Sequence, residues 1–362
     1  MNSEIRNVEF RQFVIKAVLF YALTIGLIVF INYFVDASQV ITSRMSEGMA
    51  RLALKGNIVK VPKNYNERTY QIAVVEQMHE IPDTIVIGSS RGMFLGSEIT
   101  GYKRIYNHCV SGACIEDYYA ILGLYEQKFS KLPKRIVMEV SPWVFNEYNP
   151  ESRWLENYKY LSNCERFYKE INHRKLEKKN TEKENPYISL PYFQYNILTI
   201  QEKGWKAFSV EPASVSNDKA ERAELPDGTI RYDAKMANPN AERLKKVKET
   251  RKGVSYERSD KMKKLGKIQQ VEFENLLRYL HAKNTEVVFY LQPFSVTQCK
   301  YIYDKNTNPV FKDVETYLVK TGKSSNIKVV GGYNARKFGL TDKLFIDFMH
   351  LDKEGTKITW DY

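Results

Sequence analysis

The stretch that decides the fold is TIVIGSSRG, residues 84 to 92, in which a short apolar run ends on glycine, two serines and an arginine. Aliphatic and β-branched residues that lead into a Gly-Ser-Ser turn predict a buried strand that delivers a side chain to the edge of a sheet. Ser89 and Ser90 are both candidates for that side chain. The rest of the sequence has to explain why two hydroxyl groups follow this strand.

Four further segments share the strand-like pattern, and two helical segments with amphipathic spacing alternate with them. The strand-like segments are residues 104–110, 135–142, 286–293 and 327–333, and the helical segments are residues 116–129 and 271–284. Apolar strands that alternate with amphipathic helices predict an α/β fold with a mainly parallel sheet covered on both faces, which is a three-layer sandwich.

The N-terminal region contains 19 consecutive uncharged residues, Ala17–Val35. A helix of that length spans about 28 Å, close to the hydrocarbon thickness of a bilayer. A cleaved signal peptide and a buried core helix are the alternatives. The run is longer than a usual signal-peptide core, and FVDAS at residues 34–38 offers no good cleavage site. We therefore interpret the segment as one uncleaved transmembrane helix.

This interpretation divides the chain into a cytoplasmic tail (1–16), a transmembrane anchor (17–35), a stalk (36–82), a domain in two pieces (83–150 and 271–362) and a polar, basic insertion (151–270). Positive charges are balanced across the anchor, with Arg6, Arg11 and Lys16 before it and Arg44, Arg51 and Lys55 after it. The short tail and Asp36 on the far side favour a single-pass protein of the cell membrane with an extracytoplasmic C-terminal domain.

The chain is strongly basic, with 55 Lys and Arg against 43 Asp and Glu in 362 residues. Residues 241–270 alone hold eleven basic and four acidic residues. This stretch is either a solvated helical face or mobile loop, or a surface that approaches anionic membrane or an acidic glycopolymer. Nucleic-acid binding is disfavoured because the stretch lies beyond the membrane in the preferred topology.

A hydroxyl nucleophile needs a general base, and the base needs an orienting acid. Ser90 begins whatever follows the first strand, which would leave its backbone N–H free and its hydroxyl exposed. Near the C-terminus, LFIDFMHLDKEG (residues 344–355) places Asp347 three positions before His350. In a tight turn that spacing lets the carboxylate reach one imidazole nitrogen and leaves the other for a serine.

The remaining candidate ligands predict neither a metal site nor a cofactor. Cys109, Cys114, Cys164 and Cys299 form no CxxC pair. A disulfide between Cys109 and Cys114 is open, although we favour small buried thiols. The other histidines singled out, His108, His173 and His281, have no partner at catalytic spacing and are interpreted as structural or exposed.

The order of these motifs resembles the SGNH (GDSL-type) hydrolase superfamily. IGSSRG resembles its nucleophile turn, with Ser90 in the place of the nucleophile and Ser89 where aspartate is usual. YNHCVSGA resembles its second element, and IDFMH resembles its last. The resemblance implies a flavodoxin-like fold, the triad Ser90, His350 and Asp347, and an oxyanion hole made by the N–H groups of Ser90 and Gly112.

The third family element, G-x-N-D, is absent, because the strand at 135–142 leads into SPWVFNEY (141–148). Asn146 would supply the missing side-chain donor only if the loop bends it back. Loss of one such donor costs about 10²- to 10³-fold in rate. Arg91 is either a binding residue for an anionic substrate or a structural ion pair, and Trp143 is either a sugar-stacking or a core residue.

The Gly-Ser-Ser turn, the missing element and the anchor together resemble a membrane-anchored envelope branch, which includes the D-alanylation protein of the Dlt system and alginate O-acetylation proteins. This resemblance implies a serine acyltransferase or esterase that modifies a cell-surface glycopolymer through an acyl-Ser90 intermediate. A membrane-bound O-acyltransferase is the implied partner. The alternative is a catalytically silent domain that binds glycan or scaffolds an envelope assembly complex.

Overall fold

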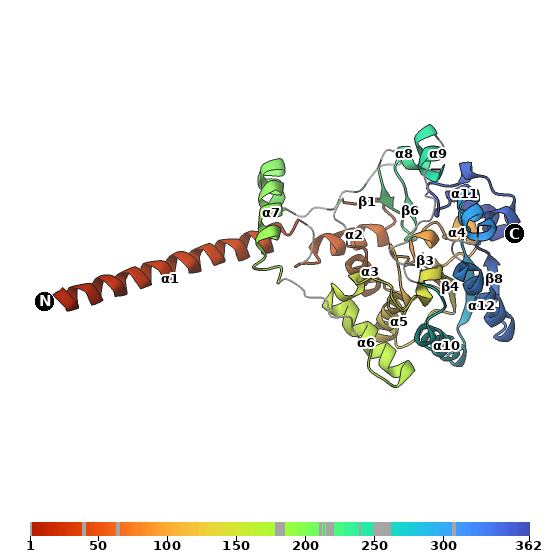
Figure 1. Ribbon diagram of the computed structural model, residues 1–362, viewed down its shortest axis with the longest axis horizontal. Coiled ribbons are helices and arrows are strands. Elements are labelled where there is room, and N and C mark those ends of the chain that lie inside the picture. Colours follow the sequence, from red (N-terminus) through yellow and green to blue (C-terminus); the bar gives the residue numbers. More distant parts are fainter. Residues whose placement is uncertain are drawn as a thin grey trace. The chain divides into compact units, whose positions relative to one another are not determined.

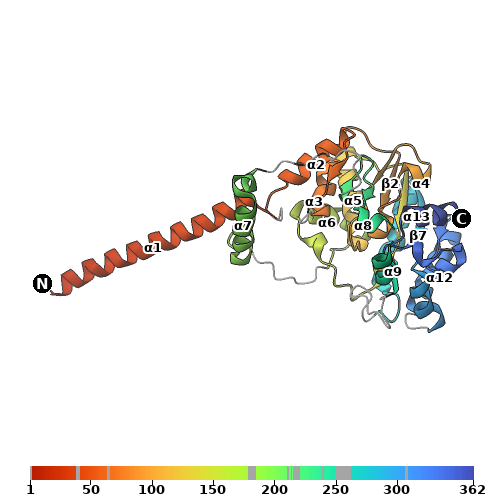
Figure 2. The ribbon, with the colours of Figure 1, turned by 90° about the horizontal axis from the view of Figure 1, so that it is seen from above.

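The computed structural model describes residues 2–37, 41–62, 66–177, 185–209, 212, 214, 221–238, 240–248, 262–305 and 309–362 (Figures 1 and 2). The chain forms two compact units. Unit 1 comprises Met1–Gly48, Pro62–Asn66 and Asn180–Glu211, and unit 2 comprises the remainder. Helix α2 (Arg44–Leu54) contains the first boundary between them.

Unit 1 is built from two helices and a short 3₁₀ segment. Helix α1 (Asn2–Val35) packs near its C-terminal end against α7 (Leu190–Lys203) and η4 (Gly204–Phe208). Most apolar side chains of α1 are exposed, and the helix is long and apolar enough from Val8 to Val35 to cross a membrane. The helix itself begins at Asn2, well before Ala17, the expected start of the anchor.

Unit 2 contains a five-stranded, fully parallel sheet with the order β3-β2-β4-β7-β8. Its strands are β2 (Thr84–Ile87), β3 (Ile105–Asn107), β4 (Arg135–Glu139), β7 (Glu286–Leu291) and β8 (Lys328–Gly331). All five lie within the segments expected from the sequence. Because consecutive residues of β2 and β3 are buried, both faces of the sheet are covered there.

A second, antiparallel sheet in unit 2 has the order β1-β5-β6. It consists of β1 (Val59–Lys60), β5 (Ala223–Glu224) and β6 (Ile230–Arg231). The hairpin β5–β6 comes from the region expected to be an insertion, and β1 comes from the region expected to be a stalk. The pairing of β1 with β5 therefore joins two segments that the sequence predicted to lie in different parts of the chain.

The α-helices of unit 2 after α2 lie around the parallel sheet. They are α3 (Glu67–Gln77), α4 (Ser97–Thr100), α5 (Ile115–Phe129), α6 (Tyr158–Asn172), α8 (Ala234–Ala237), α9 (Ala241–Lys248), α10 (Lys267–Ala282), α11 (Val296–Cys299), α12 (Val310–Ser324) and α13 (Lys353–Asp361). The expected helical segments 116–129 and 271–284 correspond to α5 and α10. Helices α10 and α12 contact β7, whereas α12 and α13 contact β8 (Figure 1).

The expected stalk is wrong, since α3 belongs to unit 2 and packs against α5. Arg68 is buried and bonds both carboxylate oxygens of Asp117 on α5, at 2.7 and 2.9 Å. Burial disfavours the guanidinium charge, but Asp117 outweighs this effect and the pKa of Arg68 is raised. A buried pair of this kind fixes α3 within the unit, because removing either partner leaves the other charge uncompensated.

The expected insertion is not one body either. Residues 151–177 belong to unit 2, where α6 packs along α5, whereas the described residues 185–209 belong to unit 1. The basic stretch 241–270 is described for 241–248 and 262–270, and residues 249–261 lie outside the described residues. All four cysteines are free and buried, so the open question about Cys109 and Cys114 resolves to buried thiols.

Candidate catalytic site

The nucleophile turn connects β2 to the 3₁₀ helix η1 (Ser90–Gly92) at the carboxyl edge of the parallel sheet. Gly88 has a φ of +151°, and a Cβ added there would lie 2.5 Å from the Cβ of Glu139 at the end of β4. A Cβ at Gly92 would lie 2.7 Å from the Sγ of Cys109. Both glycines are therefore required by close packing, and this packing holds Ser90 at the edge where such sheets bind ligands.

Ser90, His350 and Asp347 form a continuous chain of hydrogen bonds. Ser90 Oγ lies 2.8 Å from His350 Nε2, and His350 Nδ1 lies 2.7 Å from Asp347 Oδ2. Because an ionised carboxylate only accepts, Nδ1 carries the proton and Nε2 is free to accept the serine proton. The expected contact among these three side chains is confirmed, and the arrangement is that of a nucleophile, a general base and an orienting acid.

Asp347 is held by the backbone of its own turn. Its Oδ1 accepts the N–H groups of Met349 and His350, at 2.8 and 2.9 Å. Burial opposes ionisation, but His350 and these N–H groups outweigh it, and the pKa of Asp347 lies below its ordinary value. Ile346 N donates to His350 O at 2.8 Å and closes the turn. The carboxylate therefore stays charged and fixes the orientation of the imidazole.

Ser89 takes no part in this relay, as expected. It is buried, and its hydroxyl lies 3.2 Å from Ser141 Oγ while also accepting the N–H of Arg91. Its own N–H donates to Glu139 Oε2 at 2.7 Å, and Ser141 donates to Glu139 Oε1 at 2.6 Å. Ser89 thus ties the turn to the end of β4, whereas Ser90 faces the base.

Arg91 is buried, which favours the structural role over the binding of an anionic substrate. Its side chain is 1% exposed and lies over the ring of Phe294 at 4.1 Å. The guanidinium donates to the carbonyl oxygens of Met349 and Gln292, and Gln292 Nε2 donates to Met349 O as well. Arg91 therefore joins the nucleophile turn to the loop that carries His350.

Trp143 and Asn146, in and just after η2 (Pro142–Phe145), also lie away from the triad. Trp143 is 1% exposed and its indole N–H donates to Ala113 O at 3.0 Å, so it is a core residue and the sugar-stacking role is wrong. Asn146 accepts the N–H of Tyr148 and lines a cavity of about 340 Å³ with Glu147, which contains no triad residue. These contacts give no support to Asn146 as an oxyanion donor.

The loop that carries Gly112 begins beside the nucleophile turn, because Val110 N donates to Gly88 O at 2.9 Å. Gly112 has a φ of +64°, a left-handed conformation that favours glycine, in the turn closed by Ala113 N and Val110 O. Within the described residues, the N–H groups of Ser90 and Gly112 make no hydrogen bond. Both are available donors at the same edge of the sheet.

Sequence reasoning missed the residues that hold this loop. Glu67 on α3 accepts both the N–H and the hydroxyl of Ser111, and Arg153 donates to Ser111 O at 2.6 Å. Arg222, next to β5, donates to Glu67 Oε1 at 3.4 Å. No spacing signal connects these positions, since each partner lies at least 40 residues from Ser111.

Tyr232, just after β6, is close enough to Asp347 for the charge of that carboxylate to act on its pKa. Burial raises the pKa of Tyr232 to about 12, Arg222 opposes the rise, and the charge of Asp347 adds to it. The Arg222 guanidinium lies 6.0 Å from the Tyr232 ring centre. The position of Tyr232 in the sequence does not predict this electrostatic link to Asp347.

The other titratable groups fit structural roles. His108 is buried between Gln71 Oε1 and Tyr125 OH, at 2.6 and 2.7 Å, and burial lowers its pKa to about 3. His173 and His281 are exposed. Across the described ranges no group of His, Cys, Asp and Glu is arranged to hold a metal ion.

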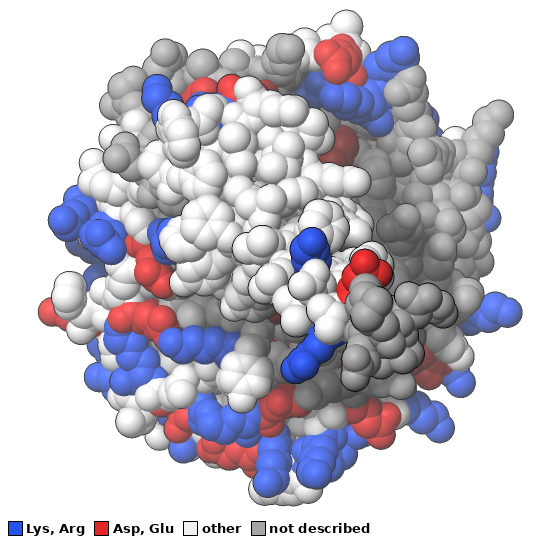
Figure 3. Space-filling view, turned by 90° about the vertical axis from the view of Figure 1, so that its left-hand side faces the viewer, with Lys and Arg blue, Asp and Glu red and all other residues white. Residues whose placement is uncertain are grey.

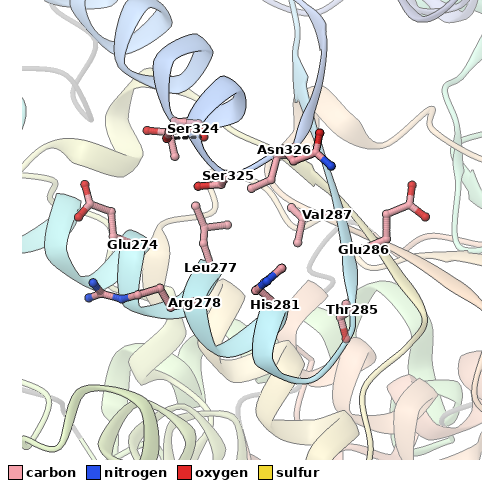
Figure 4. Close-up of a pocket in the computed structure, with 12 residues that line it drawn as sticks. Glu274, Leu277, Arg278, His281, Thr285, Glu286, Val287, Ser324, Ser325 and Asn326 are labelled. Atoms are coloured by element: carbon pink, nitrogen blue, oxygen red, sulfur yellow. Dashed lines mark hydrogen bonds between the residues drawn. The ribbon is translucent and has the colours of Figure 1, made fainter.

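A cavity of about 780 Å³ lies at the opposite edge of the sheet (Figure 4). Figure 4 shows Leu277, Arg278 and His281 of α10 on one side and Ser325 and Asn326, after α12, on another. Glu286, the first residue of β7, also lines it, so it lies at the amino ends of the strands. Because ligands of parallel sheets bind at the carboxyl ends, we place the chemistry at Ser90 and not in this cavity.

Comparison with known proteins adds no assignment, because no protein-family model and no curated protein matches this chain.

Proposed function

We propose that this protein is a membrane-anchored serine acyltransferase or esterase that works through an acyl-Ser90 intermediate. The observation that carries the proposal is the relay from Ser90 Oγ through His350 to Asp347, with distances of 2.8 and 2.7 Å. A serine hydroxyl is a weak nucleophile on its own, and an adjacent oriented imidazole is the usual means of activating it.

In the first half-reaction, His350 Nε2 takes the proton of Ser90 as Oγ attacks the carbonyl carbon of an ester. The resulting oxyanion receives hydrogen bonds from the N–H groups of Ser90 and Gly112. His350 then gives its proton to the leaving alcohol oxygen, the ester bond breaks and acyl-Ser90 remains. Asp347 stabilises the imidazolium throughout.

In the second half-reaction, His350 accepts a proton from the acceptor as the acceptor oxygen attacks the acyl carbon. His350 then gives this proton to Ser90 Oγ, the bond between Oγ and the acyl carbon breaks, and the free serine is restored. A sugar hydroxyl as acceptor gives transfer, and water gives hydrolysis. We favour transfer, because an enzyme held at a membrane is positioned beside a membrane-embedded acyl donor. The acceptor is then a cell-surface polysaccharide or teichoic-acid-like polymer, and the partner a membrane-bound O-acyltransferase.

The resemblance to SGNH hydrolases supports the same reading of the fold, with the covered parallel sheet as the middle of a three-layer sandwich. The apolar helix α1 supports single-pass attachment, and we propose that unit 2 lies on the extracytoplasmic side. An oxyanion hole made of two N–H groups and no side-chain donor implies a kcat about 10²- to 10³-fold lower than that of a complete oxyanion hole.

One observation favours a second candidate, a silent scaffold or glycan-binding domain. Glu139 and Ser141 occupy the end of β4, where the family's G-x-N-D element would follow, and they bond to Ser89. Against this candidate, the relay geometry is intact in the described structure, and a silent domain has no need of it.

The test is release of p-nitrophenol from p-nitrophenyl acetate by the full chain in detergent micelles. We expect an initial burst of one equivalent per chain, absent in Ser90→Ala and retained in Ser89→Ala. Absence of a burst with continued slow turnover in the wild type contradicts an accumulating acyl-enzyme. An equal burst in Ser90→Ala overturns the assignment of the nucleophile.

A further inference from the structure

Helix α7 is fixed to the last turns of α1. Asn32 is buried, and its side-chain nitrogen donates to the carbonyl oxygens of Pro186, Tyr187 and Ser189 at 3.0 to 3.1 Å. Asn196 Nδ2 donates back to Asn32 Oδ1 at 3.1 Å. These bonds set the position of the segment around α7 along α1.

Two further bonds and an apolar cluster complete the attachment. Asn196 Oδ1 accepts the N–H of Ala37 at 2.9 Å, and Tyr192 OH donates to Asp36 Oδ1 at 2.6 Å. The cluster unites the C-terminal end of α1 with one face of α7 and η4, and its members are Ile31, Val35, Ala37, Phe193, Ile197, Ile200, Ala207 and Phe208. One face of α7 is therefore occupied.

The other side of this segment is apolar and exposed. Tyr195 and Leu198 are three positions apart on α7 and share one helical face, and both are exposed. Trp205, in the 3₁₀ segment η4 that follows, is 88% exposed. Tyr187, Ile188 and Leu190 just before and at the start of α7 are also exposed. Figure 3 shows a broad surface on which charged side chains are few.

The location of this exposed face follows from its attachment. The candidate span ends at Val35, so a helix bonded to Asn32 and Asp36 lies at the level where the span leaves the hydrocarbon. Tyr and Trp concentrate at that level, and lysines reach from it into water. Trp205 is flanked there by Lys203 and Lys206, which have the apolar stems and charged ends that this position requires.

We propose that α7 and η4 form a second membrane attachment, an amphipathic segment that lies in the bilayer interface with Leu198 and Trp205 among the lipids. The proposal rests on the proposed anchoring by α1. Burial of Asn32 by the α7 segment fits it, because a polar side chain at the end of a span is kept from lipid by protein.

Tryptophan fluorescence in vesicles tests this directly. The chain has four tryptophans, of which Trp143 and Trp154 are buried, Trp360 is partly buried and Trp205 is exposed. The full chain is reconstituted into phosphatidylcholine vesicles whose acyl chains carry bromine near the head group or near the chain end. We expect strong quenching by the shallow bromine in the wild type and in the control Trp360→Phe, and loss of most of that quenching in Trp205→Phe.

Equal quenching in Trp205→Phe and the wild type overturns the proposal, because Trp205 then does not touch lipid. An unquenched wild type that floats with the vesicles also overturns it, and would assign the face to a protein partner instead. Failure to float refutes the anchoring on which the proposal rests. Fluorophosphonate labelling of Ser90 in the same vesicles reports the proposed chemistry independently, so the two failures are distinguishable.

Discussion

Ser90 Oγ lies 2.8 Å from His350 Nε2, although 260 positions separate the two residues in the chain. The contact exists because β2 and the 346–350 turn meet at the carboxyl edge of one parallel sheet. Arg91 maintains it, since its guanidinium bonds to the carbonyl oxygens of Met349 and Gln292. The nucleophile turn and the base loop are thus joined by a buried residue adjacent to Ser90.

The first prediction is that Ser90 and His350 act as one unit. Ser90→Ala and His350→Ala should each remove acyl-enzyme formation, and the double variant should be little slower than either single variant, since residues in one relay lose their effect together. Pre-steady-state release of p-nitrophenol measures this. If the rate losses of the two single variants multiply in the double variant, the two residues act separately.

The second prediction concerns Asp347. Asp347→Asn presents an amide that favours the wrong imidazole tautomer, so kcat should fall on the order of 10⁴-fold. In the wild type the lowered pKa keeps Asp347 ionised at neutral pH, so kcat/KM should show no loss from protonation of this carboxylate above pH 3.8. A profile of kcat/KM against pH that retains wild-type magnitude in Asp347→Asn would contradict this role.

The same lowered pKa predicts a pH-dependent contribution to stability. A carboxyl whose folded pKa lies below its unfolded value of 3.8 stabilises the fold above 3.8 and loses this effect as pH falls through the folded pKa. Asp347→Asn should therefore be less stable than the wild type at neutral pH, with the difference closing below pH 3.8. Urea unfolding of both proteins across pH measures it, and a difference that widens in acid would have the wrong sign.

Glu67 should matter to the reaction without touching substrate. Glu67→Gln replaces one acceptor of the Ser111 N–H and hydroxyl by a donor, which should loosen the Gly112 loop and lower kcat about tenfold, with KM little changed. The control is Glu98→Gln, which removes only an exposed ion pair with Lys353. Equal kcat and KM values for the two variants would show that Glu67 does not position the loop.

Arg91 should behave as a core residue. Arg91→Ala leaves two buried carbonyl oxygens without this donor and empties the space over Phe294, so it should destabilise the protein by about 3 kcal/mol. Arg336→Ala breaks an exposed ion pair with Asp304 and should cost less than about 1 kcal/mol. Thermal unfolding compares them. A raised KM for an anionic ester with unchanged stability in Arg91→Ala would restore the substrate-binding interpretation.

The sheet and the triad were accessible to sequence analysis because both depend on local patterns. The apolar run that ends in Gly-Ser-Ser marks a strand end, and the carboxyl ends of parallel strands share one edge. The three-position spacing of Asp347 and His350 fits a tight turn, which is where the structure has them. The burial of Arg91 was not accessible, since its acceptors are backbone carbonyl groups that no side-chain pattern reveals. The sequence left the role of Trp143 open for a related reason, because the partner of its indole N–H is the carbonyl oxygen of Ala113.

The domain boundaries expected from the sequence are wrong where polar residues are buried. Helix α3 is rich in polar residues and resembles a stalk. However, Arg68 bonds to Asp117 on α5, and Gln71 bonds to His108 in the loop after β3. The sequence likewise predicts residues 185–209 to be part of one insertion, although Asn196 bonds to Asn32 of α1. Pairings across such long separations leave no periodic signal in the sequence.

The central claim, that Ser90 and not Ser89 carries the acyl group, is tested most directly by peptide mass spectrometry of the full chain after reaction with a fluorophosphonate probe. We predict one adduct per chain, located on Ser90 and absent from Ser90→Ala, because only Ser90 contacts the base while Ser89 is buried against Ser141. An adduct on Ser89, or an unmodified Ser90 in the folded chain, would contradict the account.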